Sequence, residues 1–97
     1  MTTAINKAKA KARIFSALYH SFMYLYHPAH KGSKAIAYVE HQKAFYLCEF
    51  WNSLHPRKSI SLGEVLEMAA DQFNTLHRTN KTPAQLLDDL TEIRKSF

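Results

Sequence analysis

Residues that form turns are scarce in this sequence. It holds only two glycines and three prolines among its 97 residues. An all-β fold needs many tight turns, and most of these are built on such residues, so their scarcity argues against one. Alanine, leucine, lysine, glutamate and glutamine are plentiful instead, and they favour helix. The composition therefore predicts an all-α protein.

Cysteine is almost absent, and long apolar runs are missing. The single cysteine, Cys48, has no partner in the chain for a disulfide, which fits a reducing compartment. No apolar run reaches the ~18 residues that a membrane span needs, and the N-terminus lacks the cleavage site of a signal peptide. We therefore expect a cytoplasmic protein. A mitochondrial transit peptide stays open as an alternative, because residues 1–13 are basic and contain no acid.

Apolar spacing and turn residues divide the chain into four helical segments. We predict helices over about residues 3–26, 34–54, 61–77 and 83–97. The intervening loops are short, and short loops between helices usually make antiparallel neighbours. A chain of this length supports one modest core. The sequence thus predicts an all-α, four-helix up-down bundle that forms a single domain over residues 1–97.

Residues that cap helices precede each of these segments. Thr2 or Thr3 can cap the first helix and Ser33 the second, because each offers a side-chain oxygen to the free amides of the first turn. Ser61 and Thr82 begin capping sequences before the third and fourth helices. These residues predict where the helices start.

The second predicted helix is apolar on nearly every side. Residues 44–54 hold four aromatic side chains, including the only tryptophan, Trp51. A further apolar stripe contains Val39, Tyr46 and Phe50. Because a helix that is apolar all round must be packed on several sides, we place this helix at the centre of the bundle. Any apolar face of residues 35–54 that four helices leave uncovered is a candidate interface.

Positive charge is concentrated in the first part of the chain. Residues 1–60 carry nine lysines and arginines against two acids, whereas residues 61–97 carry four against six. The start of the first helix holds Lys7, Lys9, Lys11 and Arg13 and no acid, although the N-terminus of a helix prefers negative charge. Cations placed this way destabilise the helix slightly unless they meet an anionic partner. This pattern favours an anionic ligand for the first half.

In an up-down bundle the cations gather at two poles, roughly 30 Å apart, because about twenty helical residues rise 1.5 Å each. The first predicted pole comprises Lys7, Lys9, Lys11, Arg13, Arg57, Lys58, Arg94 and Lys95. The second comprises Lys31, Lys34, Arg78 and Lys81, with His27, His30 and His77. The residues that we predict to bind an anionic partner are Lys7, Lys9, Lys11, Arg13, Arg57, Lys58, Lys31 and Lys34.

No motif of a catalytic or metal site is present. The chain lacks a glycine-rich phosphate loop and a Gly-x-Ser-x-Gly sequence. His27, His30 and His77 could approach one another, but the chain has no Cys-x-x-Cys or His-Glu-x-x-His spacing. Cys48 lies in the most apolar segment, where a thiol is unreactive, so we interpret it as core. We expect no enzymatic activity, no cofactor and no metal.

Our leading hypothesis is a small non-enzymatic accessory protein that binds nucleic acid or a nucleoprotein complex through its basic poles. Its contacts would be mainly to phosphates. A solvated basic tip and an acidic protein or membrane surface are the alternatives for the basic segment, although our preferred partners include no membrane. The rival hypothesis is a protein–protein interaction module, as inhibitor, adaptor or homodimer, that uses the apolar faces of residues 35–54. The small size also suits inhibitors carried by phages or mobile elements.

Overall fold

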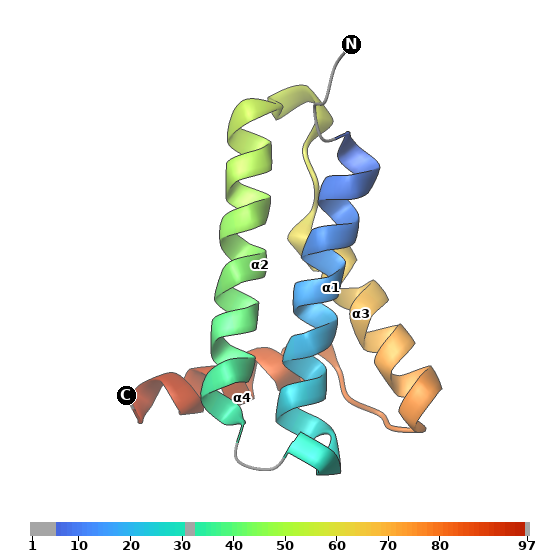
Figure 1. Cartoon of the computed structure of the whole chain (residues 1–97), viewed down its shortest axis with the longest axis vertical. Helices are drawn as coiled ribbons and strands as arrows, with labels where there is room; N and C mark the ends of the chain where they lie inside the picture. Colours follow the sequence, from blue (N-terminus) through green and yellow to red (C-terminus); the bar gives the residue numbers. More distant parts are fainter. Residues whose placement is uncertain (1–5, 31–32, 97) are drawn as a thin grey trace.

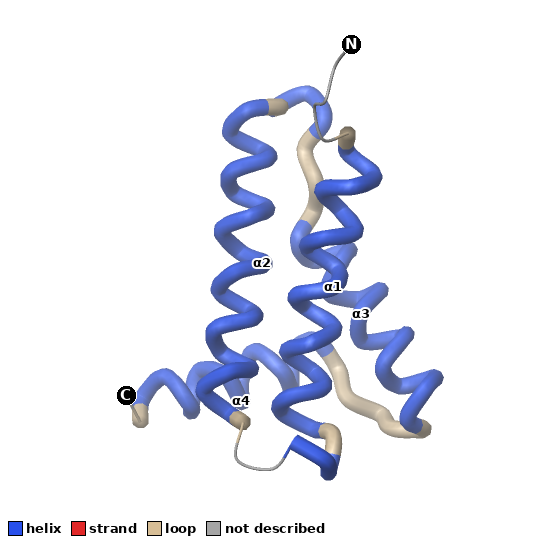
Figure 2. Tube along the Cα trace, viewed as in Figure 1, coloured by secondary structure: helices blue, strands red, loops and turns tan. Residues whose placement is uncertain are grey.

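The computed structural model describes residues 6–30 and 33–96, and within these ranges it is helical with no strand. Four α-helices follow one another along the chain, and loops and two short 3-10 helices connect them (Figure 2). They are α1 (Lys7–Tyr26), α2 (Lys34–Leu54), α3 (Leu62–His77) and α4 (Pro83–Lys95). Two short 3-10 helices, η1 (Pro28–His30) and η2 (Pro56–Lys58), lie on either side of α2. The prediction of an all-α four-helix bundle is confirmed.

The first helix begins later than predicted, at Lys7. Its N-cap is Asn6, whose side-chain oxygen accepts a hydrogen bond from the backbone N–H of Lys9 at 2.9 Å. The two caps that we predicted, Thr2 and Thr3, lie outside the described residues. Asparagine is among the best N-cap residues, so a local signal existed at position 6.

Two of the other predicted caps are confirmed and one is not. The hydroxyl of Ser61 accepts from the backbone N–H of Glu64 at 3.3 Å, and that of Thr82 accepts from Gln85 at 3.1 Å. Ser33 precedes α2 as predicted, but its side chain makes no capping hydrogen bond. Side-chain caps therefore fix the starts of α3 and α4, whereas α2 depends more on packing.

The central helix is α1, not α2. Figure 1 shows α1 and α2 running antiparallel, with α3 on the other side of α1. Accordingly, α1 packs against both α2 and α3. The fourth helix crosses behind the lower ends of α1 and α2 instead of running along them (Figure 1). The prediction that the second helix is central is thus wrong, and only the first three helices follow the up-down pattern.

The core lies on the two sides of α1. Ile14, Leu18 and Phe22 are fully buried there. The ring of Phe22 stacks on that of Phe73 from α3, with centroids 5.7 Å apart. Towards α2 the buried side chains include small ones, and Ala37 is one of them. Small side chains let the two helices approach closely, so that the buried hydroxyl of Ser21 donates to the Ala37 carbonyl at 2.9 Å.

The outer face of α2 is exposed, which contradicts the predicted burial of its apolar stripe. Val39, Tyr46 and Phe50 are 58%, 64% and 67% exposed. The buried side chains of this helix are Ala37, Ala44, Cys48 and Trp51. Because α4 crosses the end of the bundle, no helix of the described chain covers the outer face along its length. The face is therefore available to a partner.

Two side chains near the end of α2 hold the linker to α3 in place. Asn52 donates to the backbone carbonyl of Ile60 at 3.0 Å and accepts from its N–H at 2.7 Å. Trp51 donates from its indole nitrogen to the carbonyl of Lys58 at 2.8 Å. Because Ile60 is buried, these bonds satisfy main-chain groups that water cannot reach. They fix η2 and its cations against the end of α2.

Replacing Asn52 by alanine is expected to lower the free energy of unfolding by about 1–3 kcal/mol, because it leaves the buried N–H of Ile60 unpaired and leaves the Ile60 carbonyl with the weak thiol donor of Cys48. Urea unfolding measures this. Ser53→Ala is the matched control, since Ser53 is the exposed neighbour and should stay within about 0.5 kcal/mol. Equal stabilities of the two variants would contradict the role given to Asn52.

Candidate functional site

Six cations lie at the end of the bundle where α1 begins and η2 follows α2 (Figure 1). We call this surface the basic end, and its residues are Lys7, Lys9, Lys11, Arg13, Arg57 and Lys58. Lys7 and Lys11 line a small hollow together with Ser59, which follows directly on Lys58, and Ser61. The structure thus brings two segments of cations, more than forty positions apart in the sequence, to one end.

The cations of the basic end have no acidic partner within ion-pair distance in the part of the chain that the structure describes. The ion pairs found there are Lys95 with Glu92, and His20 with Glu40. Glu64, in the first turn of α3, is the acid that shares the hollow with Lys7 and Lys11. Five of the six cations are exposed and Lys11 is half-buried. The basic end therefore presents unneutralised positive charge to solvent.

The four cations of α1 divide between two faces of the helix. Residues four apart lie on the same face of a helix, so Lys7 and Lys11 share one face and Lys9 and Arg13 share another. The first pair faces the linker before α3. Arg13 faces the other way, towards the end of α2. Charge thus surrounds the tip of α1, and its first turn holds no acid to offset the helix dipole.

The structure does not bring Arg94 and Lys95 to the basic end, which corrects their predicted place. Arg94 lines a cavity with Tyr38 and His41 of α2, and Lys95 pairs with Glu92 at 3.2 Å. The second half of α4, which carries both residues, lies beside the first half of α2, because α4 crosses the end of the bundle (Figure 1). An up-down path for the last helix would have carried them to the other end.

The second predicted pole is less open to an anion than the first. Lys34 borders a hollow that also holds the carboxylates of Asp89 and Glu92, so acids of the protein itself stand beside it. Lys81 lies over the ring of Tyr26, with its ammonium 4.6 Å from the ring centroid. Lys31 lies outside the described residues. Of the eight predicted site residues, the six at the basic end are therefore the better candidates.

The rings of three histidines at the second pole, His27, His30 and His77, lie close together. The ring of His27 lies 4.9 Å from that of His77 and 5.7 Å from that of His30. His77 is also held by the hydroxyl of Tyr19, 3.1 Å from its Nε2 atom. Across residues 6–30 and 33–96, no group of three His, Cys, Asp or Glu side chains has the arrangement of a metal site. These histidines pack as aromatic rings.

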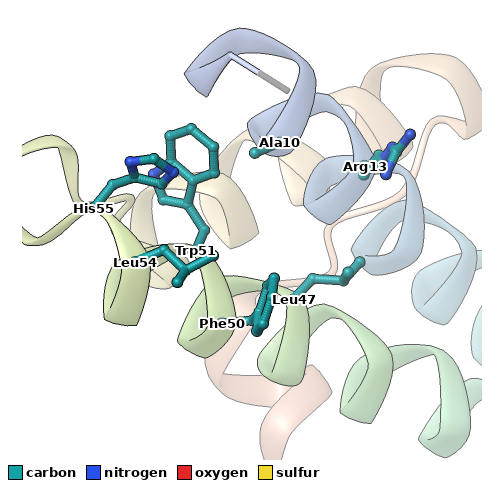
Figure 3. A pocket seen from close by; sticks show the side chains of 7 residues that line it. All are labelled: Ala10, Arg13, Leu47, Phe50, Trp51, Leu54 and His55. Carbon is teal, nitrogen blue, oxygen red and sulfur yellow. The ribbon is translucent and has the colours of Figure 1, made fainter. Parts of the chain in front are cut away.

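An apolar groove of about 340 Å³ adjoins the basic end. It lies between the start of α1 and the last turns of α2, and its walls are apolar except for Arg13 and His55 (Figure 3). The ring of His55 stands 4.0 Å from that of Trp51. Figure 3 places Arg13 at one side of the groove and Trp51 with His55 at the other. The residues that line it are Ala10, Arg13, Leu47, Phe50, Trp51, Leu54 and His55.

Sequence reasoning missed this groove. Leu47, Phe50 and Leu54 recur at spacings of three and four, which identifies a shared helix face. We interpreted that face as buried. The missing information was that small Ala10 stands opposite Trp51 and leaves space there.

Cys48 has the environment of a core residue. It is 5% exposed, and its thiol lies 3.3 Å from the carbonyl of Ile60, to which it donates. Burial raises the pKa of this thiol above its ordinary value. A raised pKa leaves little thiolate at neutral pH, so Cys48 is a poor nucleophile.

His41 lies between α2 and α4 in a cavity that Leu87, Leu90 and Arg94 also line. Its Nε2 atom is buried and has no hydrogen-bond partner among the described residues. Burial lowers the pKa of this imidazole, because the charged form is poorly solvated there. The folded protein therefore prefers His41 neutral.

This burial makes stability depend on pH. The unfolded imidazole takes up a proton near pH 6.5, whereas folded His41 resists protonation until a lower pH. The contribution of neutral His41 to the free energy of unfolding is therefore fully present above about pH 6.5. It decreases as the pH drops below this value and levels off near the pKa of His41 in the folded protein. In urea unfolding between about pH 7 and pH 5, His41→Leu should lose less stability than the unmodified protein. The other histidines are common to both proteins and serve as the internal control. Parallel pH profiles would contradict this account.

The chain matches no protein-family model, no curated protein and no solved structure. No helix in the described part of the chain is long and apolar enough to cross a membrane.

Proposed function

We propose that this protein is a non-enzymatic accessory protein that binds nucleic acid, alone or in a nucleoprotein complex, through the basic end. The observation that carries the proposal is the convergence of six cations from α1 and η2 with no acidic partner in ion-pair distance within the described chain. Charges that the protein does not neutralise itself are available to phosphates.

The position of these cations supports the proposal further. Lys7 and Lys9 stand in the first turn of α1, where the helix dipole already repels positive charge. Bound phosphates would relieve both this repulsion and the repulsion between neighbouring cations. The bonds from Trp51 and Asn52 to the linker hold Arg57 and Lys58 beside them before any ligand arrives. A surface organised in advance loses less entropy on binding.

We expect contacts to phosphates and little sequence preference. The cations are lysines and arginines around a helix tip, and no helix among the described residues offers a basic face long enough to read a groove. Lysine in particular binds phosphate as a point charge. Non-specific binding of this kind depends strongly on salt.

The proposal is tested by titrating a labelled duplex and a labelled single strand at about 50 and about 200 mM salt. Four to six phosphate contacts predict that affinity for the duplex falls on the order of 10²–10³-fold between these conditions. A single strand should show a shallower dependence. The absence of binding at the lower salt, or binding that salt leaves unchanged, would overturn the proposal.

A second candidate function is a protein–protein interaction module that uses the outer face of α2. Here the observation is the exposure of Ile36, Val39, Tyr46, Phe50 and Leu54, each between 47% and 67%. Monomeric soluble proteins seldom expose a continuous apolar stripe along a whole helix, and such patches mark interfaces. The groove beside Phe50 and Leu54 extends the same surface to Arg13. The two candidate functions use adjoining surfaces and do not exclude each other.

A further inference from the structure

The exposed side chains of α2 follow the spacing of a helix that packs along another helix. Ile36, Val39, Tyr46, Phe50 and Leu54 are the exposed apolar members, and Lys43 fills the gap between the second and third. Successive positions in this set are three or four residues apart, so they form one stripe along the helix. The stripe spans nearly all of the 21-residue helix.

The area of this stripe is large for a surface left in water. An aromatic side chain carries about 150–250 Å² of surface, and Tyr46 and Phe50 are 64% and 67% exposed. These two rings alone leave roughly 200–300 Å² uncovered. The three aliphatic members bring the stripe into the range of the largest patches on monomeric proteins. A partner helix would remove most of this area from water.

The stripe is close to symmetric about its own middle. When two copies of α2 are laid antiparallel, Ile36 falls opposite Leu54, Val39 opposite Phe50, and Lys43 opposite Tyr46 of the second copy. Two of the pairs are centred between Ala44 and Phe45, and the third is centred on Phe45. A two-fold interface needs this property, because each residue must meet the same partner from both sides. We propose that the outer face of α2 pairs antiparallel with α2 of a second copy of this chain.

Lys43 favours the antiparallel arrangement over a parallel one. In a parallel, in-register pair the two Lys43 ammonium groups would face each other in an apolar seam. In the antiparallel pair each one faces the ring of Tyr46, which attracts a cation. A single lysine within an apolar seam is a known way of fixing register and orientation.

The position of the basic end also favours the antiparallel pair, for an independent reason. It lies at the end of α2 that carries Leu54 and η2. A parallel pair would bring the two basic ends together, whereas an antiparallel pair separates them by about 30 Å, the length of the helix. This separation exceeds the Debye length of about 10 Å at 0.1 M salt, so the repulsion is screened.

This inference rests on the second candidate function and is independent of nucleic-acid binding. It predicts that sedimentation between about 1 and about 200 µM gives a mass near twice the 11.2 kDa of the chain at the upper concentrations. Phe50→Glu should raise the dissociation constant of the dimer on the order of 10²-fold or more, since it places two carboxylates in the seam. Leu76→Glu is the matched control, because Leu76 is equally apolar and 58% exposed on α3.

A second experiment tests the register. Val39→Cys mixed with Phe50→Cys should cross-link on oxidation, because the two positions face each other in the proposed pair. Val39→Cys by itself should not, since its two copies would lie about 16 Å apart along the helix. The unmodified protein, whose Cys48 is buried, gives the background. A monomer at all concentrations, a dimer that Phe50→Glu leaves intact, or cross-linking of Val39→Cys with itself would each overturn the inference. None of these results would affect a salt-dependent affinity for nucleic acid in the separate titration.

Discussion

Replacing Lys7, Lys11, Arg57 and Lys58 together by glutamine should reduce the affinity for a DNA duplex on the order of 10²–10³-fold at low salt. These four cations border the linker between η2 and α3. Each phosphate contact contributes about 0.9 to the slope of log affinity against log salt concentration. The slope should therefore shrink by about three to four, which a titration over several salt concentrations measures.

The control for this variant removes the same charge elsewhere. Lys34, Arg78, Arg94 and Lys95 lie away from the basic end and are all exposed, and their replacement by glutamine should change the slope by less than about one. Circular dichroism of both variants checks that they are folded before their affinities are compared. Equal losses of affinity in the two variants would mean that net charge alone, and not the basic end, attracts nucleic acid.

A substitution that should raise the affinity for the duplex gives a further test of the basic end. Glu64 is the acid that shares a hollow with Lys7 and Lys11. If phosphates bind there, Glu64→Gln should raise the affinity about two- to tenfold, because it removes a nearby like charge. No variant outside the site should do this, and a decrease in affinity would argue that phosphates bind elsewhere.

Phe22→Ala should lower the free energy of unfolding by about 3–5 kcal/mol. Its ring is fully buried in α1 and stacks on Phe73 of α3. Because small domains are stable by only about 5–15 kcal/mol, this variant should be close to unfolding at room temperature. Urea or thermal unfolding followed by circular dichroism measures the loss.

Phe50→Ala is the comparison that makes this result informative about the fold. Phe50 is 67% exposed, so at protein concentrations where the chain is monomeric its replacement should cost no more than about 0.5 kcal/mol. If α2 were the central helix, the two substitutions would destabilise the protein alike. A large loss in Phe50→Ala and a small one in Phe22→Ala would contradict the packing described above.

Most boundaries of the helices, though not the start of α1 at Lys7, were predicted because the residues beside them carry strong local signals. The bounds of α2 agree with the predicted 34–54, since Pro28 and Pro56 lie outside both ends. The hydroxyls of Ser61 and Thr82 cap α3 and α4 as expected. Such signals act within a few residues, so a sequence reveals them without any knowledge of tertiary structure.

The central helix was not predictable from the same information. Apolar side chains around α2 indicated that it could be covered on several sides, but not which sides would be. The answer depended on the direction of α4, and its connection from α3 is held by Asn74. The side chain of Asn74 donates to the carbonyl of Lys81 at 2.7 Å and accepts from its N–H at 2.9 Å. Bonds of this kind between a side chain and a distant backbone leave no periodic trace in a sequence.

The candidate site was partly predictable for a related reason. Lys9 and Arg57 come to one end because α1 and α2 form a hairpin, and short loops indicate hairpins. Arg94 does not lie at that end, because this position would require α4 to run alongside the other helices. Whether the cations were already neutralised by acids of the protein could not be judged before the helices were placed.

The most direct test of the proposed nucleic-acid surface is to map it residue by residue. Backbone amide resonances of the ¹⁵N-labelled protein should be recorded during titration with a short DNA duplex at low salt. We predict that the largest shifts fall on residues 7–13 and 57–61, and that they reverse when salt is added. Shifts confined to α3 and α4, or to the outer face of α2, would contradict the claim that the basic end binds phosphate.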